Sequence, residues 1–226
     1  MINNSLEINS VAFDTYYMSP RRRLMELLPD SAPRRALEIG CGAGANLHFL
    51  KLKYPSIETF GVEIRPEAAE VARKEKYVDN IYVADLLAED APLFDPGMFD
   101  VIIMSHVLEH FPKPELVIHR ALTWLNDTGR LLIALPNVRH ISVLLKLVLK
   151  GDFKYEDSGI LDRTHLRFFT RKSATRFLEE NGLSVEKIET DIVGSNSVRL
   201  SKWSAGIMDD FASHAYNFVT TKKRSL

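Results

Sequence analysis

A glycine-rich segment directly after a short apolar run is the feature that most constrains the fold of this chain. Residues 36–44 read Ala-Leu-Glu-Ile-Gly-Cys-Gly-Ala-Gly. Glycine is needed where the backbone turns tightly and comes close to a ligand without a Cβ atom in the way. A helix that begins just after such a loop offers free N–H groups and the positive end of its dipole. The segment therefore predicts a strand, a ligand-binding loop and a helix, as at the start of an open α/β sheet.

Short apolar runs alternate with segments of helical periodicity along the rest of the chain. The predicted strands are 35–39, 57–63, 80–84, 99–104, 130–135, 183–190 and 216–223, the last with a basic end. The predicted helices are 44–53, 66–74, 114–125, 140–150 and 170–181, and residues 126–129 are a predicted turn. Such alternation predicts βαβ units and a parallel sheet, with the strand at 216–223 as a candidate edge strand.

Composition excludes several classes of protein. Lys and Arg number 29 against 30 Asp and Glu, so no nucleic-acid partner is expected, because such proteins usually carry a basic excess. Cys41 is the only cysteine, which excludes a disulfide framework and a zinc ribbon and fits a reducing compartment. No metal is expected. No apolar run approaches the roughly 18 residues that span a bilayer, so the expected location is the cytoplasm.

Carboxylates stand at or near the ends of the first three predicted strands. Glu63 ends the second strand and suits the hydroxyls of a ribose. The glycine spacing also satisfies the dinucleotide pattern G-x-G-x-x-G/A, so a nicotinamide cofactor is open at this point. Glu38 favours a ligand with an amino group, since a carboxylate there would repel a pyrophosphate. Asp85 follows the third strand, where an adenine amino group can be recognised.

Together these residues resemble the class I S-adenosylmethionine-dependent methyltransferases. The resemblance is close over residues 34–137 and includes Phe99-Asp100-Val101-Ile102, Val107-Leu108-Glu109-His110 and Gly129-Arg130-Leu131-Leu132. It implies a Rossmann-like α/β fold with a mostly parallel seven-stranded sheet in the order 3-2-1-4-5-7-6, an antiparallel seventh strand and helices on both faces. It also implies S-adenosylmethionine as cofactor and S-adenosylhomocysteine as product.

The resemblance assigns roles to individual residues. Glu38 would hold the methionine amino group, Glu63 the ribose, and Asp85 with Leu86 the adenine end. The full set of implied cofactor-binding residues is Glu38, Gly40, Cys41, Gly42, Gly44, Glu63, Ile64, Asp85, Leu86, Ser105 and His106. Cys41 is expected to be only a small residue of the loop, because no His or Lys near it in sequence activates its thiol.

One main domain is expected after a short extension. Residues 1–30 are predicted as a helical lead-in. Its Tyr16, Tyr17 and Arg21–Arg23 suit a flap over the cofactor carboxylate, and a solvated basic turn is the equal alternative. Residues 31–226 are predicted as the methyltransferase domain, with an insertion at about 138–169 that acts as a lid on the substrate side. The apolar helix at 140–150 within it suits a lid on the sheet edge, a dimer contact or a peripheral membrane contact. A monomer or homodimer is expected.

The irregular segment at 151–168 is the candidate acceptor site, because a loop of this length is unusual unless it is functional. His165 is the candidate general base, with Asp162 beside it, since histidine titrates near neutral pH. Tyr155, Arg163, Arg167 and His110 are candidate substrate-binding residues. The structural alternative is a salt-bridged loop that joins the sheet to the next helix.

Part of this segment resembles a subset of bacterial methyltransferases associated with surface polysaccharide synthesis. Gly-Asp-Phe-x-Tyr at 151–155 and Leu-Asp-Arg-Thr-His-Leu-Arg-Phe-Phe-Thr at 161–170 carry this resemblance, which implies a sugar or glycan hydroxyl as acceptor. The broader resemblance includes quinone-biosynthesis O-methyltransferases, so a phenolic acceptor is open, as is an N-acceptor. Two other functions remain as alternatives, a nicotinamide-dependent sugar oxidoreductase and a catalytically idle cofactor-binding module.

Overall fold

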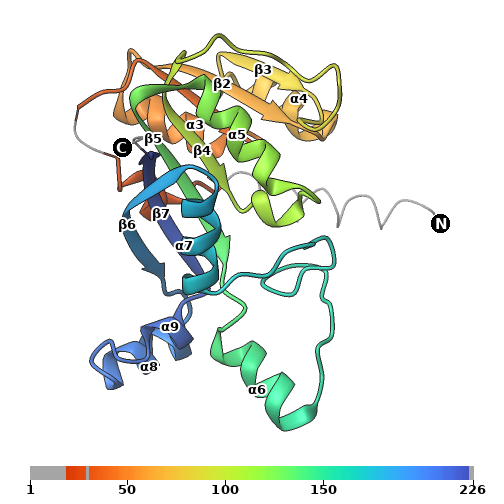
Figure 1. Cartoon of the computed structure of the whole chain (residues 1–226), viewed down its shortest axis with the longest axis vertical. Coiled ribbons are helices and arrows are strands. Elements are labelled where there is room, and N and C mark those ends of the chain that lie inside the picture. Colours follow the sequence, from red (N-terminus) through yellow and green to blue (C-terminus); the bar gives the residue numbers. More distant parts are fainter. Residues whose placement is uncertain (1–18, 29–30, 224–226) are drawn as a thin grey trace, which may run out of the picture.

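A seven-stranded sheet in the order β3-β2-β1-β4-β5-β7-β6 forms the centre of the molecule (Figure 1). This computed structural model describes residues 19–28 and 31–223. The strands are β1 Arg35–Ile39, β2 Glu58–Glu63, β3 Asn80–Val83, β4 Phe99–Ser105, β5 Leu125–Pro136, β6 Leu183–Asp191 and β7 Ala215–Lys222. Only β7 runs antiparallel to its neighbours β5 and β6. The predicted sheet order and the antiparallel seventh strand are therefore confirmed.

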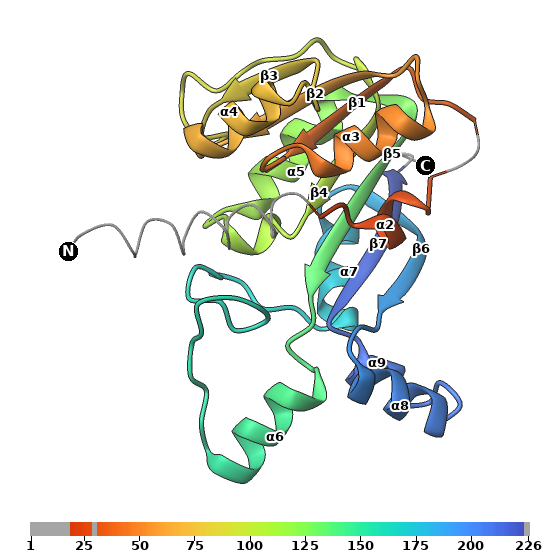
Figure 2. The ribbon, with the colours of Figure 1, turned by 180° about the vertical axis from the view of Figure 1, so that it is seen from behind.

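Helices cover both faces of this sheet (Figures 1 and 2). The helices are α2 Arg22–Met25, α3 Ala45–Lys53, α4 Pro66–Lys74, α5 Pro114–Trp124, α6 Ile141–Lys150, α7 Arg171–Glu180, α8 Ser195–Trp203 and α9 Asp209–Ala212. Apolar side chains of α5 and α7 pack on one face of the sheet. Those of α2, α3 and α4 pack on the other. The central strand β4 is buried on both faces, as its nearly all-apolar sequence predicts.

Local sequence signals place several helix ends correctly. Pro66 and Pro114 occupy the first turns of α4 and α5, where proline costs no hydrogen bond. Thr170 caps α7 as expected, and its side chain and that of Ser173 bond each other's backbone N–H in a capping box. These helices begin where the sequence predicts because the signals act within a few residues.

The C-terminal half differs from expectation in three places. The strand at 215–222 is not an edge strand, because β6 pairs with its free side, and the buried run Ala215–Thr220 matches that inner position. β5 begins at Leu125, and the expected turn at 126–129 instead lies within it, at a register shift opposite β4. Helices α8 and α9, between β6 and β7, had no clear signal in the sequence.

The segment between β5 and α7 stands away from the sheet, below the carboxyl ends of β4 and β5 (Figure 2). Val138 N–H donates to Phe169 O at 2.9 Å, which closes the base of this insertion near its predicted limits. Within α6 only Val143 is buried, so the apolar surface of the helix is not packed on the sheet. The function of the insertion as a lid stays a prediction.

The predicted lead-in is described only in part. Residues 1–18, with Tyr16 and Tyr17, lie outside the described residues, whereas Arg22–Met25 form α2. Leu24 and Met25 of this short helix are fully buried against the sheet. Among the helices that the structure describes, none is long and apolar enough to cross a membrane.

Candidate active site

The glycine loop adopts a backbone that other residues rarely tolerate. Gly40, Gly42 and Gly44 have φ values of 70°, 53° and 84°, all in the left-handed region. A Cβ atom on Gly40 would lie 2.6 Å from Cγ2 of Val107 in the segment after β4. The loop is therefore pressed against that segment, and the first turn of α3 begins directly after Gly44.

One carboxylate oxygen of Glu38, beside this loop, lacks a hydrogen-bond partner among the described residues. Its side chain is 2% exposed, and Oε1 accepts a 2.6 Å hydrogen bond from Nδ2 of Asn46. Oε2 is buried and has no hydrogen-bond partner among the described residues. Burial raises the pKa of Glu38 to about 8, and the nearby Glu63 adds to the effect. A ligand ammonium would supply the missing donor and the missing opposite charge.

Asn46 links this carboxylate to the N-terminal part of the chain. Its Oδ1 accepts a 2.7 Å hydrogen bond from the backbone N–H of Arg21, just before α2. This hydrogen bond brings the backbone of Arg21 close to the predicted cofactor site. A role of the Arg21–Arg23 side chains there stays a prediction. Whether a flap forms there stays a prediction.

Glu63 braces the glycine loop from the end of β2. Its Oε2 accepts from Gly42 N–H at 2.8 Å, and its Oε1 accepts from Arg65 N–H at 2.9 Å. A carboxylate has about four acceptor sites, so both oxygens retain capacity for ribose hydroxyls. Ile64 beside it is 61% exposed, which leaves it available to a ligand.

Asp85 and Leu86, which follow β3, differ in their exposure to solvent. Asp85 is exposed, and its Oδ1 accepts from Leu87 N–H at 2.8 Å, an arrangement that fixes the turn. Leu86 is 2% exposed, with its side chain in the apolar core. An adenine contact from Asp85 and Leu86 stays a prediction.

Cys41 is a packed residue of the loop. Its thiol lies against Gly61 of β2, where a Cβ atom would be 2.6 Å from Sγ. Burial raises the pKa of the thiol well above its usual value, so Cys41 stays neutral at physiological pH. This fits the expected role as a small loop residue whose backbone faces the ligand.

The end of β4 carries a strained histidine. His106 has a φ of 53°, which costs a non-glycine residue energy and persists only where the surroundings enforce it. Its N–H donates to Ala134 O at 3.0 Å, and Ser105 pairs with Ala134 in the sheet. Such strain is frequent at functional sites, which agrees with the predicted role of Ser105 and His106.

Glu109 is a further buried carboxylate, which the sequence prediction did not include among the site residues. It is fully buried, and neither of its carboxylate oxygens has a hydrogen-bond partner among the described residues. Nδ1 of His106 lies 3.6 Å from Oε1, and Nε2 of His165 lies 3.9 Å from the same oxygen.

The Glu109 backbone holds the acceptor segment in place. Its carbonyl accepts hydrogen bonds from Leu166 N–H at 2.8 Å and Arg167 N–H at 3.1 Å. These bonds place His165, which is 8% exposed, against the end of β4. Burial lowers the pKa of His165 below its usual value, although the Glu109 carboxylate opposes the shift. His165 is therefore neutral near pH 7.

Asp162 is tied up by its own loop. Its Oδ1 accepts from the Thr164 N–H at 2.8 Å and from the Thr164 hydroxyl at 2.6 Å. Burial tends to raise the pKa of Asp162, but these hydrogen bonds outweigh it and lower the pKa. The Thr164 hydroxyl and carbonyl oxygens lie 3.0 Å and 3.3 Å from Nδ1 of His110. Asp162 is thus linked to His110 through Thr164, and its catalytic role stays a prediction.

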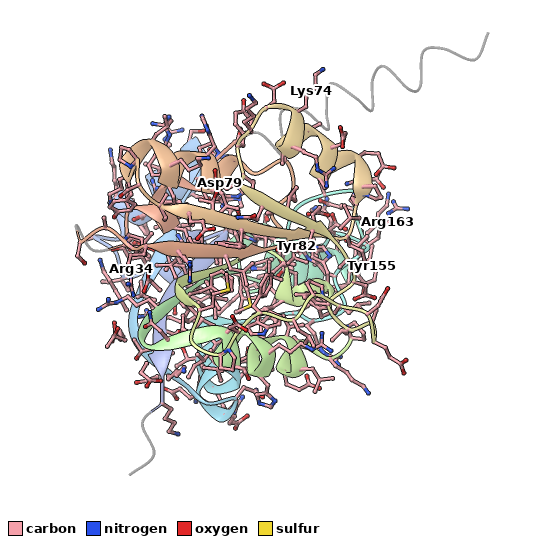
Figure 3. The ribbon with its side chains drawn as sticks, turned by 90° about the horizontal axis from the view of Figure 1, so that it is seen from above. Arg34, Lys74, Asp79, Tyr82, Tyr155 and Arg163 are labelled. Atoms are coloured by element: carbon pink, nitrogen blue, oxygen red, sulfur yellow. The ribbon has the colours of Figure 1, made fainter. Side chains whose placement is uncertain are left out.

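The remaining predicted substrate residues lie further out on the segment. Tyr155 packs with Phe153 and Phe168, at ring-centroid distances of 5.9 Å and 6.1 Å, and is 47% exposed. Arg163 pairs with Asp157, and Nη2 of Arg167 donates to Pro112 O at 2.8 Å. Figure 3 shows Tyr155 and Arg163 at the opposite end of the sheet from Arg34, which precedes β1.

A shallow pocket at the other end of the sheet has a structural explanation. Asp100 lines it and accepts hydrogen bonds from the N–H groups of Arg34 and Arg35 and from Nδ2 of Asn126. It lies at the amino ends of β1 and β4, whereas ligands of open α/β sheets bind at the carboxyl ends. The chemistry is therefore expected at the glycine loop.

Comparison with known proteins identifies the class. A family model described as a methyltransferase domain matches residues 13–188, so the chain belongs to that family. A solved structure of a SAM-dependent methyltransferase from Archaeoglobus fulgidus is 20% identical, with a TM-score of 0.67, and the match covers 94% of this chain and 99% of that one. At this identity it supports the fold alone, and it agrees with the sheet order described above.

Two curated relatives show the range of the family. A ubiquinone biosynthesis O-methyltransferase from Xanthomonas euvesicatoria is 24% identical over 69% of this chain and 68% of its own length. A demethylmenaquinone methyltransferase from Thermotoga maritima is 26% identical over 79% of this chain and 81% of its own length. Family membership favours methyl transfer over the nicotinamide alternative. It also supports S-adenosylmethionine as cofactor, which the unpaired Glu38 oxygen and the cramped glycine loop fit.

Proposed function

We propose that this protein transfers the methyl group of S-adenosylmethionine to a hydroxyl oxygen, and that the acceptor is a sugar or glycan. The buried Oε2 of Glu38, unpaired beside a left-handed glycine loop, is the observation that carries the cofactor assignment. In this proposal Glu38 binds the ammonium of the cofactor, Glu63 the ribose and the backbone of the glycine loop the amino-acid part.

The cofactor, when bound, supplies an electrophilic methyl carbon on a sulfonium. Transfer breaks the S–C bond, forms an O–C bond and releases the hydroxyl proton. The residues of this chain have to align the oxygen and accept that proton. Nδ1 of His165 donates to Ile160 O, so Nε2 carries the free lone pair and faces the end of β4. His165 is thus the proposed proton acceptor.

The aromatic cluster of Phe153, Tyr155 and Phe168 supports a ring-shaped acceptor. Partly exposed aromatic faces stack on the apolar faces of sugars, and nearby Arg163 and Asp162 offer polar groups to hydroxyls. A phenolic or quinol ring is the second candidate, because two curated relatives are named for quinone biosynthesis. The same aromatic cluster would stack on such a ring.

Methyl-labelled S-adenosylmethionine incubated with fractionated bacterial extract tests the proposal. The fractions separate nucleotide sugars, lipid-linked glycans, phenolic and quinone compounds, protein and RNA. Label in a sugar fraction supports the first acceptor class, and label in the phenolic fraction supports the second. The absence of label, combined with intact binding of S-adenosylhomocysteine, would instead indicate a catalytically idle module.

A further inference from the structure

We propose that Glu109, His110 and His165 form a binding site for a single divalent transition-metal ion. One ligand atom from each of the three residues lies within 4.8 Å of those of the other two, and the part of the chain that the structure describes contains this cluster at the end of β4. The sequence predicted no metal, and the three residues come from two segments more than fifty positions apart. The site would take Zn²⁺, Mn²⁺ or a similar ion.

The hydrogen bonds that the two histidines make at Nδ1 leave their Nε2 atoms free to bind an ion. Nδ1 of His165 lies 3.0 Å from Ile160 O, and Nδ1 of His110 lies 3.3 Å from Thr164 O. A carbonyl oxygen only accepts, so both Nδ1 atoms carry the hydrogen and both Nε2 atoms carry a lone pair. Histidine ligands of metals almost always donate their other ring N–H to such a backbone carbonyl or carboxylate.

A second contact, with the Thr164 hydroxyl, also places the hydrogen of His110 on Nδ1. The Thr164 hydroxyl donates its hydrogen to Asp162, so its oxygen accepts from Nδ1 of His110, 3.0 Å away. A carboxylate that orients a metal-binding histidine through a bridge is a frequent arrangement around metal sites. Asp162 and Thr164 would therefore act together to orient His110 for metal binding.

The carboxylate of Glu109 lies close to Nε2 of His165 and lacks a hydrogen-bond partner among the described residues. The side chain is fully buried, and neither oxygen finds a donor among the residues described. Its Oε1 lies 3.9 Å from Nε2 of His165, so a lone pair faces a carboxylate oxygen. Two such acceptors repel each other unless a cation lies between them. Ligand atoms about 2.1 Å from one ion are at most about 4.2 Å apart. The His165–Glu109 pair already meets this limit, and the widest pair of the cluster, within 4.8 Å, has to close by about 0.6 Å or less when an ion binds.

The ion would deepen the proposed function, and this part rests on that function. Three protein ligands leave coordination positions for water or for an acceptor oxygen. A hydroxyl bound there would lose its proton more readily, because the ion stabilises the oxyanion. Nε2 of His165 would then be a ligand rather than the proton acceptor. Metal binding itself does not depend on methyl transfer.

Metal titration of the tag-free full chain tests the site directly. After removal of metal with a chelator, the protein is titrated with Zn²⁺ in a calorimeter and with Co²⁺ in a spectrophotometer. One equivalent of each ion should bind, and Co²⁺ should give visible bands typical of nitrogen and oxygen ligands. No saturable binding to the unmodified protein would overturn the proposal.

Variants assign the ligands. Glu109→Gln and His165→Asn should each weaken binding of Zn²⁺ by more than about 100-fold, and Thr164→Val by about 10- to 100-fold, since it removes only the orienting bond. The matched control is His119→Asn, an exposed histidine on α5 that should leave binding unchanged. Zn²⁺ affinity that survives Glu109→Gln, in protein that still binds S-adenosylhomocysteine, would overturn the site.

A last comparison separates this proposal from the proposed function. Chelation should abolish methyl transfer and leave the affinity for S-adenosylhomocysteine unchanged. Metal binding without methyl transfer to any fraction would support the site and contradict the proposed function. Methyl transfer that persists after complete chelation would overturn the part assigned to the ion in the reaction.

Discussion

Two buried carboxylates, one on each side of the candidate site, differ in their hydrogen-bond partners. Glu38 on β1 has one oxygen bonded to Asn46 and one oxygen free, beside a loop built from glycine. Neither carboxylate oxygen of Glu109, after β4, has a hydrogen-bond partner among the described residues, and Oε1 lies near ring nitrogens of His106 and His165. The first therefore suits a cationic ligand group, whereas the second suits a cation held jointly with histidine nitrogens. The contrast indicates a division of labour between cofactor binding and acceptor chemistry.

The largest expected effect lies on the Glu109 side. His165→Asn removes the lone pair of Nε2, whether it accepts the proton or binds an ion, so turnover should fall about 10²- to 10⁴-fold. The affinity for S-adenosylhomocysteine, measured by calorimetry, should stay the same because His165 does not contact the glycine loop. A variant with unchanged turnover would remove His165 from the mechanism.

The Glu38 side should respond in the opposite way. Glu38→Gln keeps the shape but removes the charge that faces the ligand ammonium, and hydrogen bonds to charged groups contribute about 1.5–3 kcal/mol. Affinity for S-adenosylhomocysteine should fall about 10- to 100-fold, with little change in Zn²⁺ binding. Equal affinity in the variant and the unmodified protein would exclude Glu38 as the ammonium partner.

Gly40→Ala tests the contact between the glycine loop on the Glu38 side and Val107 in the segment after β4. An alanine there meets Cγ2 of Val107 at 2.6 Å and has a φ of 70°, so Gly40→Ala should lower the free energy of unfolding. The left-handed backbone alone costs about 1–2 kcal/mol. The double variant with Val107→Ala should recover the steric part and not the backbone part. Thermal denaturation of Gly40→Ala, Val107→Ala and the double variant separates the two parts, and full recovery would contradict the backbone strain.

A smaller expected effect is a pH dependence of the free energy of unfolding that arises from protonation of Glu38. Its folded pKa of about 8 lies above the ordinary value of 4.5, so the folded, ligand-free chain binds more protons between these values than the unfolded chain. Its contribution to stability is complete below pH 4.5 and is lost as pH rises through 8. The Glu38→Gln variant should lack this decline in denaturant titrations from pH 5 to 9. The same decline in both proteins would assign it to another group.

Ligand binding should also displace that proton. Below pH 8 most Glu38 side chains are protonated in the ligand-free protein, and an ammonium partner favours the carboxylate. Binding of S-adenosylhomocysteine at pH 7 should therefore release most of one proton per chain. Calorimetry in buffers of different ionisation enthalpy measures this release, and Glu38→Gln is the control that should show none.

Much of the fold follows from signals that act over short distances. Proline at the start of α4 and α5 and the capping box of α7 lie within one helical turn of the ends that they mark. The buried run of β4 likewise identifies a central strand. The position of β7 could not be read locally, because an inner strand is defined by neighbours on both sides, and β6 supplies one of them through pairing.

The sequence by itself predicted the cofactor half of the candidate site. The glycines, Glu38 and Glu63 lie within one βαβ unit, so their spacing alone implies a shared ligand. Only the tertiary structure brought Glu109 close to His110 and His165 and linked Asp162 to His110 through Thr164. His165 reaches Glu109 because two backbone N–H groups bond to the Glu109 carbonyl across more than fifty residues. No local pattern encodes that contact, since it depends on how the insertion after β5 docks against the end of β4.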